Sequence, residues 1–67
     1  MKETIINHVA KLRLQFGYTQ EDLAQTIGVT RQTIIAIEKG NYTPSVLLAL
    51  KLSQCFKKPV EEVFSFK

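Results

Sequence analysis

Two side chains that can read nucleotide bases stand together at the start of a predicted helix. The segment GVTRQTIIAIEKG, residues 28–40, places Arg31 and Gln32 directly after Thr30. A guanidinium group matches the paired acceptors of guanine, and a glutamine amide can bond adenine at two positions. Ile35, one helical turn after Arg31, has an apolar side chain that suits a thymine methyl group. These residue types in this order favour contacts with the base edges of double-stranded DNA.

The same helix is predicted to face the core on one side and solvent on the other. Ile34 and Ile37 have the spacing of an inward pair, which leaves the opposite face and its margins to Arg31, Gln32, Ile35 and Ala36. For Ile35, partial burial against the core and a base contact are equally compatible with the sequence. Thr30 is a good N-cap, and Thr30, Thr33 and the free amides at helix starts suit phosphate oxygens, which fix position and not sequence.

Two helices are predicted before this one. Apolar residues recur at helical spacing over residues 9–16, and Gly17 is placed to end that helix in a left-handed conformation. Thr19 and Asp22 are three residues apart, as in a capping box, and predict the start of a second helix that stops at Gly28. The helix with the base-reading side chains follows the second helix across a tight turn.

Two prolines indicate two further helices. Thr43 is placed at the N-cap of a fourth helix, with Pro44 at the first helical position, where a missing N–H does no harm. This helix is predicted to run to about residue 56. Pro59 opens a fifth, short helix, whose first turn holds two glutamates where the helix dipole favours them.

The two ends of the chain are compatible with short strands. Thr4, Ile5 and Ile6 have β-favouring side chains, and Phe64 and Phe66 fall on one side of an extended segment. A pair of short strands is marginal in water. We therefore expect that, if the ends pair, the helices hold them together.

The length predicts one domain over residues 1–67, and the helix signals described above predict an all-α, five-helix fold for it. The chain is 45% hydrophobic and 22% charged, with a net charge of +3, which suits a globular protein that binds a polyanion. One cysteine, Cys55, and one histidine, His8, complete neither a disulfide nor a zinc site. No apolar run reaches membrane-spanning length and no signal peptide is evident, so we expect a cytoplasmic protein without metal or cofactor.

A helix-turn-helix consists of two short helices joined by a turn that often contains glycine, and residues 20–39 have this pattern. The longer stretch TQEDLAQTIGVTRQTIIAIEKGNYTPS resembles the phage-repressor-like helix-turn-helix family, the Cro and lambda repressor type, also called the xenobiotic response element family. The segments NHVAKLR, LALKLSQCF and VEEVF look like its first, fourth and fifth helices. The chain is most similar to short stand-alone members of the cytolysin repressor type, whose ends form a small antiparallel sheet.

The resemblance implies roles for individual residues. Gln20 would bond a phosphate and brace the recognition helix, and Arg13 and Glu38 would form an ion pair between the first and third helices. Bases would be read by Arg31, Gln32, Ile35 and Ala36. The DNA backbone would be contacted by Thr19, Gln20, Thr30, Thr33, Lys39, Asn41 and Tyr42. Ile35 and Lys58 depart from the residue types common in the family, so the operator sequence cannot be taken from a relative.

The fourth predicted helix has more apolar residues than one helix face can bury. Residues 46–50 and Leu52 are all apolar, so some of these side chains remain outside the core. They are either ordinary exposed residues or part of a homodimer interface, and the short chain favours the interface because a partner adds buried core. The candidate interface residues are Leu47, Leu48, Leu50, Val60, Phe64 and Phe66.

These features together predict a transcriptional regulator that binds double-stranded DNA sequence-specifically. We expect a homodimeric repressor whose two recognition helices, about 34 Å apart, enter the major groove of a near-palindromic operator. The alternative is a protein-interaction module, such as an antitoxin or accessory factor, in which Arg31 and Gln32 are merely solvated helix-start residues. An enzyme is not expected, because no set of polar side chains converges on a cleft.

Overall fold

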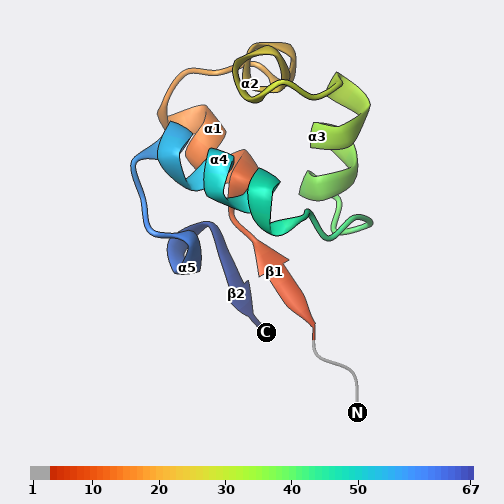
Figure 1. The fold of residues 1–67 in the computed structure, drawn as a ribbon, viewed down its shortest axis with the longest axis vertical. Helices are drawn as coiled ribbons and strands as arrows, with labels where there is room; N and C mark the ends of the chain where they lie inside the picture. Colours follow the sequence, from red (N-terminus) through yellow and green to blue (C-terminus); the bar gives the residue numbers. More distant parts are fainter. Residues whose placement is uncertain (1–3) are drawn as a thin grey trace.

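The computed structural model describes residues 4–67, which form five helices and one two-stranded sheet (Figure 1). Residues 1–3 of the predicted domain lie outside the described residues. The elements, in chain order, are β1 (Ile5–Asn7), α1 (Val9–Gln15), α2 (Gln20–Ile27), α3 (Arg31–Glu38), α4 (Val46–Phe56), α5 (Val60–Val63) and β2 (Phe64–Phe66). The predicted five-helix fold with a small terminal sheet is confirmed.

The capping residues that define α2 are the predicted ones. The Thr19 Oγ1 atom accepts a hydrogen bond from the Asp22 amide at 2.9 Å, and the Asp22 carboxylate accepts one from the Thr19 amide at 3.2 Å. Gly28 ends α2 in the left-handed conformation, with a φ of 77°, which glycine adopts without steric penalty. Thr30 then caps α3 by accepting from the Thr33 amide at 3.3 Å. Because the helix ends on both sides of the turn are capped, the orientation of α2 relative to α3 is fixed.

The predicted start of α4 is wrong by about two residues. Ser45, and not Thr43, is the N-cap, and its Oγ atom accepts a hydrogen bond from the Leu48 amide at 3.2 Å. Thr43 and Pro44 precede the helix, because a residue before proline is pushed toward extended backbone and serine is at least as good a cap as threonine. At the other end of the helix, Lys57 takes the left-handed conformation that glycine usually supplies, with a φ of 53°.

The sheet joins the two ends of the described chain. It is antiparallel, with Ile5 opposite Phe66, and Asn7 opposite Phe64. The amide of His8 donates to the carbonyl of Val63 at 2.8 Å, which carries the pairing to the start of α1. The sheet therefore lies directly against the beginning of α1 and the end of α5.

The core is apolar and draws on all five helices. Among the described residues the buried side chains are all hydrophobic: Val9, Leu12, Leu23, Ala24, Ile27, Ile34, Ile37, Leu48, Leu52, Phe56 and Val63. Ile34 and Ile37 are 0% and 1% exposed, so the predicted inward pair of α3 is confirmed. None of the helices within residues 4–67 is both long and apolar enough to cross a bilayer.

Candidate nucleic-acid interface

α3 presents a polar first turn to solvent while its far face is buried. Arg31 and Gln32 are exposed, and Ile35 and Ala36 are half-buried at the margin of the same face. α2 packs across α3 at the top of the molecule in Figure 1. The four side chains predicted to read bases are therefore on the surface side of a helix whose position is set by the core.

Glu38, the last residue of α3, is the centre of a polar cluster that fixes this helix. The Arg13 Nε atom of α1 lies 2.7 Å from Glu38 Oε2, and the Gln20 Nε2 atom of α2 donates to Glu38 Oε1 at 3.0 Å. The paired side chains of Arg13 and Glu38 are only 13% and 10% exposed. Arg13 also donates to the Tyr18 carbonyl at 3.0 Å. α1 and α2 thus hold the same end of α3 through one carboxylate.

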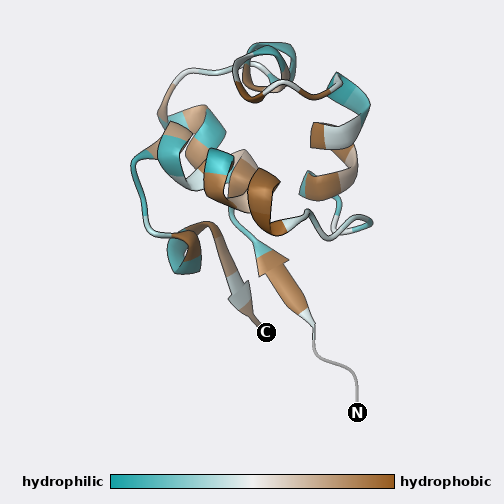
Figure 2. Cartoon of the chain, in the orientation of Figure 1, coloured by the Kyte–Doolittle hydropathy of each residue, from teal (hydrophilic) through white to brown (hydrophobic). Residues whose placement is uncertain are grey.

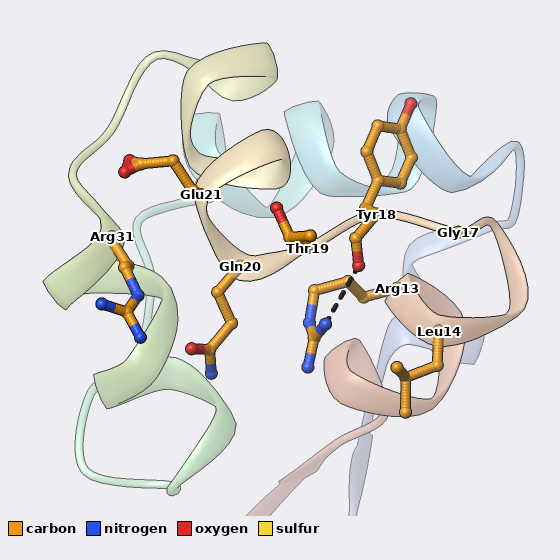
Figure 3. Close-up of a pocket in the computed structure, with 8 residues that line it drawn as sticks. All are labelled: Arg13, Leu14, Gly17, Tyr18, Thr19, Gln20, Glu21 and Arg31. Atoms are coloured by element: carbon orange, nitrogen blue, oxygen red, sulfur yellow. Dashed lines mark hydrogen bonds between the residues drawn. The ribbon is translucent and has the colours of Figure 1, made fainter.

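An open hollow lies between α1, the start of α2 and the start of α3 (Figure 3). It is lined by Arg13, Leu14, Gly17, Tyr18, Thr19, Gln20, Glu21 and Arg31, and its volume is about 760 Å³. The side chains of Arg31, Gln20 and Arg13 follow one another along one side of it in Figure 3. Arg13 is already paired with Glu38, so the exposed guanidinium of Arg31 and the amino end of α2 are the groups here that favour a phosphate.

One acidic residue in this hollow was missed from the sequence. Glu21, which the sequence analysis did not single out, lines the hollow together with Arg31 from the first turn of α2. Its carboxylate opposes the approach of a phosphate to Arg31. The hollow therefore carries charges of both signs and is not uniformly positive.

The loop after α3 carries three exposed polar residues, Lys39, Asn41 and Tyr42. Tyr42 lies closer to the reading face than its sequence position suggested, because it lines a shallow hollow with Gln32, Thr33 and Ala36. Thr30 and Thr33 are already joined, with their hydroxyl oxygens 3.1 Å apart. A phosphate at the start of α3 would share these hydroxyl groups with the helix cap.

The two residues considered for other chemistry have structural surroundings. The His8 Nε2 atom lies 3.3 Å from Ser65 Oγ, across the end of the sheet. Cys55 packs against the core beside Tyr18, and its thiol raises the pKa of Tyr18, chiefly through a side-chain hydrogen bond. Within residues 4–67 no three histidine, cysteine or acidic side chains gather as metal ligands would.

The candidate interface residues do not all lie on the surface. Leu47, Leu50 and Phe66 are 65%, 50% and 71% exposed, and Val60 and Phe64 are half-buried. Leu48 is a core residue, so its prediction as an interface residue is wrong: the helix turns it inward with Leu52. Exposed apolar residues outside the candidate list are Ile5, Ile6, Leu14, Phe16 and Val46. In Figure 2, β1 and the first half of α4 are coloured brown because their residues are hydrophobic.

Proteins with similar sequences are regulators. The helix-turn-helix family model matches residues 9–63. The chain is 59% identical over 58 residues to the uncharacterised HTH-type transcriptional regulator YgzD of Bacillus subtilis, covering 87% of this chain and 88% of that protein. It is 33% identical over 57 residues to the cryptic phage CTXphi transcriptional repressor RstR of Vibrio cholerae, covering 85% of this chain and 51% of RstR.

The fold has a solved counterpart. The restriction-modification controller protein C.AhdI from Aeromonas hydrophila superposes with a TM-score of 0.75 at 29% sequence identity, covering 82% of this chain and 83% of that chain. The resemblance found in the sequence is therefore confirmed by family, relatives and fold. The chain belongs to the helix-turn-helix family of DNA-binding transcriptional regulators, of the Cro and lambda repressor type, and not to a family of enzymes.

Proposed function

We propose that the protein is a homodimeric repressor that acts in the cytoplasm by binding a near-palindromic operator through the major groove. The observation that carries the proposal is the exposure of Arg31 and Gln32 on a helix whose other face is buried through Ile34 and Ile37. Only side chains held away from their own core can reach the edges of base pairs. In this proposal Ile35 and Ala36 complete the reading face.

Contacts with the DNA backbone would position this reading face. The hollow beside Arg31 would take one phosphate, with Gln20 and Thr19 at its edge. Lys39, Asn41 and Tyr42 would contact the backbone from the loop on the other side of α3. Phosphate contacts on both sides of a recognition helix fix its depth and register in the groove.

A second copy of the chain is the proposed partner. Exposed apolar side chains on α4 and the sheet, among them Leu47, Leu50 and Phe66, would be buried between two protomers. A domain of this length gains stability from such burial, and a two-fold dimer supplies two reading helices about one DNA turn apart. Repression is favoured over activation by the similarity to RstR, whose name is that of a repressor.

Selection of bound duplexes from a random pool tests the proposal directly. We expect an inverted repeat with half-site centres about 10 base pairs apart to be recovered. Recovery of sequences with no preference over random DNA at about 0.15 M salt would contradict sequence-specific binding. A single unrepeated site would contradict the homodimer alone, and capture of a different protein in place of DNA would favour an interaction module.

A further inference from the structure

One hydrogen bond connects the terminal sheet to α3. The side-chain Nδ2 atom of Asn7 donates to the carbonyl oxygen of Ile37 at 2.9 Å, although the two residues are 30 positions apart. Asn7 is the last residue of β1 and pairs with Phe64 of β2. Its Oδ1 atom accepts from the Val9 amide at 3.2 Å. The one half-buried amide therefore joins the sheet, the first turn of α1 and the last turn of α3.

The carbonyl that Asn7 contacts belongs to the last turn of α3. The last carbonyls of a helix lack partners within the helix. Ile37 O accepts from the Gly40 amide at 3.0 Å, and Asn7 supplies a second donor. The neighbouring residue, Glu38, is held by Arg13 and Gln20. Polar side chains from β1, α1 and α2 thus converge on the carboxyl end of α3, while the amino end carries Arg31 and Gln32 into solvent.

The core and α2 support α3 along one face, and the polar contacts at its carboxyl end fix its angle there. Eight residues of α-helix are about 12 Å long, so a tilt of about 10° at the fixed end moves the far end by about 2 Å. A bidentate hydrogen bond to a base tolerates far less than that. A group that sets the angle at Ile37 therefore affects how well Arg31 and Gln32 meet their bases.

We infer that Asn7 is a positioning residue for DNA reading, because it transmits the geometry of the terminal sheet to the recognition helix through the Ile37 carbonyl. The inference rests on the proposed DNA binding. It also gives the sheet a second role, since Ile5, Ile6 and Phe66 are exposed there and belong to the surface proposed to join two copies. Dimer contacts at the sheet would reach α3 through this amide.

The substitution Asn7→Asp keeps one of the two hydrogen bonds of the Asn7 side chain and removes the other. Aspartate keeps an acceptor for the Val9 amide, and its negative charge is favourable at the start of α1. It removes the donor and sets a carboxylate oxygen against Ile37 O. Thr4→Asp is the matched control, because it adds the same charge at an exposed position beside the sheet. Asn7→Ser is the neutral second variant, whose hydroxyl can cap α1 but is too short to reach α3.

The decisive measurement is the ratio of affinities for the selected operator and for random duplex at one salt concentration, together with the melting temperature. We expect Asn7→Asp and Asn7→Ser to lower this ratio about tenfold, within the range of one lost base contact. Asn7→Ser should leave the random-duplex affinity unchanged, and Asn7→Asp should lower it only as far as Thr4→Asp does. A merely structural role would lower both affinities together, in proportion to the folded fraction.

The possible outcomes are distinguishable. Folded variants that keep the native ratio would overturn the role of Asn7 and leave the proposed function intact. A native protein without any operator preference would overturn the proposed function first. If Asn7→Asp does not fold, Asn7→Ser decides the matter, and a drop in the ratio for Thr4→Asp equal to that for Asn7→Asp would assign the effect to charge alone.

Discussion

The Nε2 atom of Gln20 donates a hydrogen bond to Oε1 of Glu38 at 3.0 Å, so the residue that opens α2 holds the residue that closes α3. The family resemblance assigned Gln20 two tasks, a phosphate contact and the bracing of α3. The structure contains the bracing contact, and it uses only one end of the amide. The side-chain oxygen of Gln20 still has lone pairs to accept from a donor, whereas a phosphate would need the second hydrogen of Nε2.

The ion pair between Arg13 and Glu38 gives a first prediction, about stability. Glu38→Ala leaves the Arg13 guanidinium largely buried without its carboxylate, and we expect the free energy of unfolding to fall by about 3 kcal/mol. Arg13→Met combined with Glu38→Leu removes both charges and should recover much of this loss. Urea unfolding of Glu38→Ala and of the double variant measures the difference. Equal losses for the double variant and Glu38→Ala would show that packing, and not the unpaired charge, is responsible.

The cap of α4 gives a second prediction with a control two residues away. Ser45→Ala removes the acceptor for the Leu48 amide, and we expect a loss of about 1 kcal/mol. Thr43→Ala changes an exposed residue outside the helix and should alter stability by less than about 0.5 kcal/mol. Thermal unfolding compares them, and a larger loss for Thr43→Ala would place the cap where the sequence first suggested.

Substitutions of Arg31 and of Lys39 distinguish base reading from contact with the DNA backbone. Arg31→Ala should relax specificity at one base position of the selected operator and weaken its binding by about 1 to 3 kcal/mol. Lys39→Ala should weaken all duplexes alike and lower the salt slope of binding by about 1. Titrations of operator and random duplex at several salt concentrations give both quantities. Parallel losses for both variants on every sequence would contradict this division of roles.

Glu21 provides a prediction of gained affinity. Glu21→Gln removes the acidic side chain that lines the hollow with Arg31, and we expect duplex affinity to rise about threefold at low salt, with the gain shrinking as salt screens the charge. Asp22→Asn is not a suitable control, because Asp22 takes part in the capping box. Glu61→Gln, at an exposed position of α5, removes one negative charge as well, but away from the hollow. Equal gains for both variants would point to net charge alone.

The proposed dimer can be tested with two leucines of nearly equal exposure. Leu47 on α4 and Leu14 on α1 are 65% and 67% exposed, so Leu47→Glu and Leu14→Glu disturb the isolated protomer to a similar small extent. We expect Leu47→Glu to raise the dimer dissociation constant by at least about tenfold, because a charge is buried in the interface, and Leu14→Glu to leave it unchanged. Sedimentation at micromolar concentration measures both. A native protein that is monomeric both free and on DNA would remove the dimer.

Local chemistry explains why most of the fold was predictable. The residues that cap α2 and α3 act through hydrogen bonds or backbone angles within four residues: Thr19, Asp22, Gly28 and Thr30. Their effects can therefore be predicted from the sequence. The strands were predicted from side-chain types and from the family resemblance, and the register that pairs Ile5 with Phe66 came only from the structure.

The errors arose where neighbouring choices are nearly equal in energy. Thr43 and Ser45 are both good caps, and the backbone around Pro44 decides between them. Leu47 and Leu48 differ by one helical step of about 100°, which turns one outward and the other inward. Asn7 was not singled out, because its contact with Ile37 spans 30 positions and an asparagine at a strand end has many ordinary roles.

The pairing of Ile5 with Phe66 closes a loop of nearly the whole chain, so its entropic penalty on folding is greater than that of any contact between successive helices. α2 and α3, by contrast, meet across a turn of three residues and lose little chain entropy when they pack. We expect the helical pair to form early in folding and the sheet to zip up last. On the ribosome, the contact that closes the fold would thus form only after β2 has emerged, and the ability to pair with a second copy would be the final property that a newly made molecule acquires.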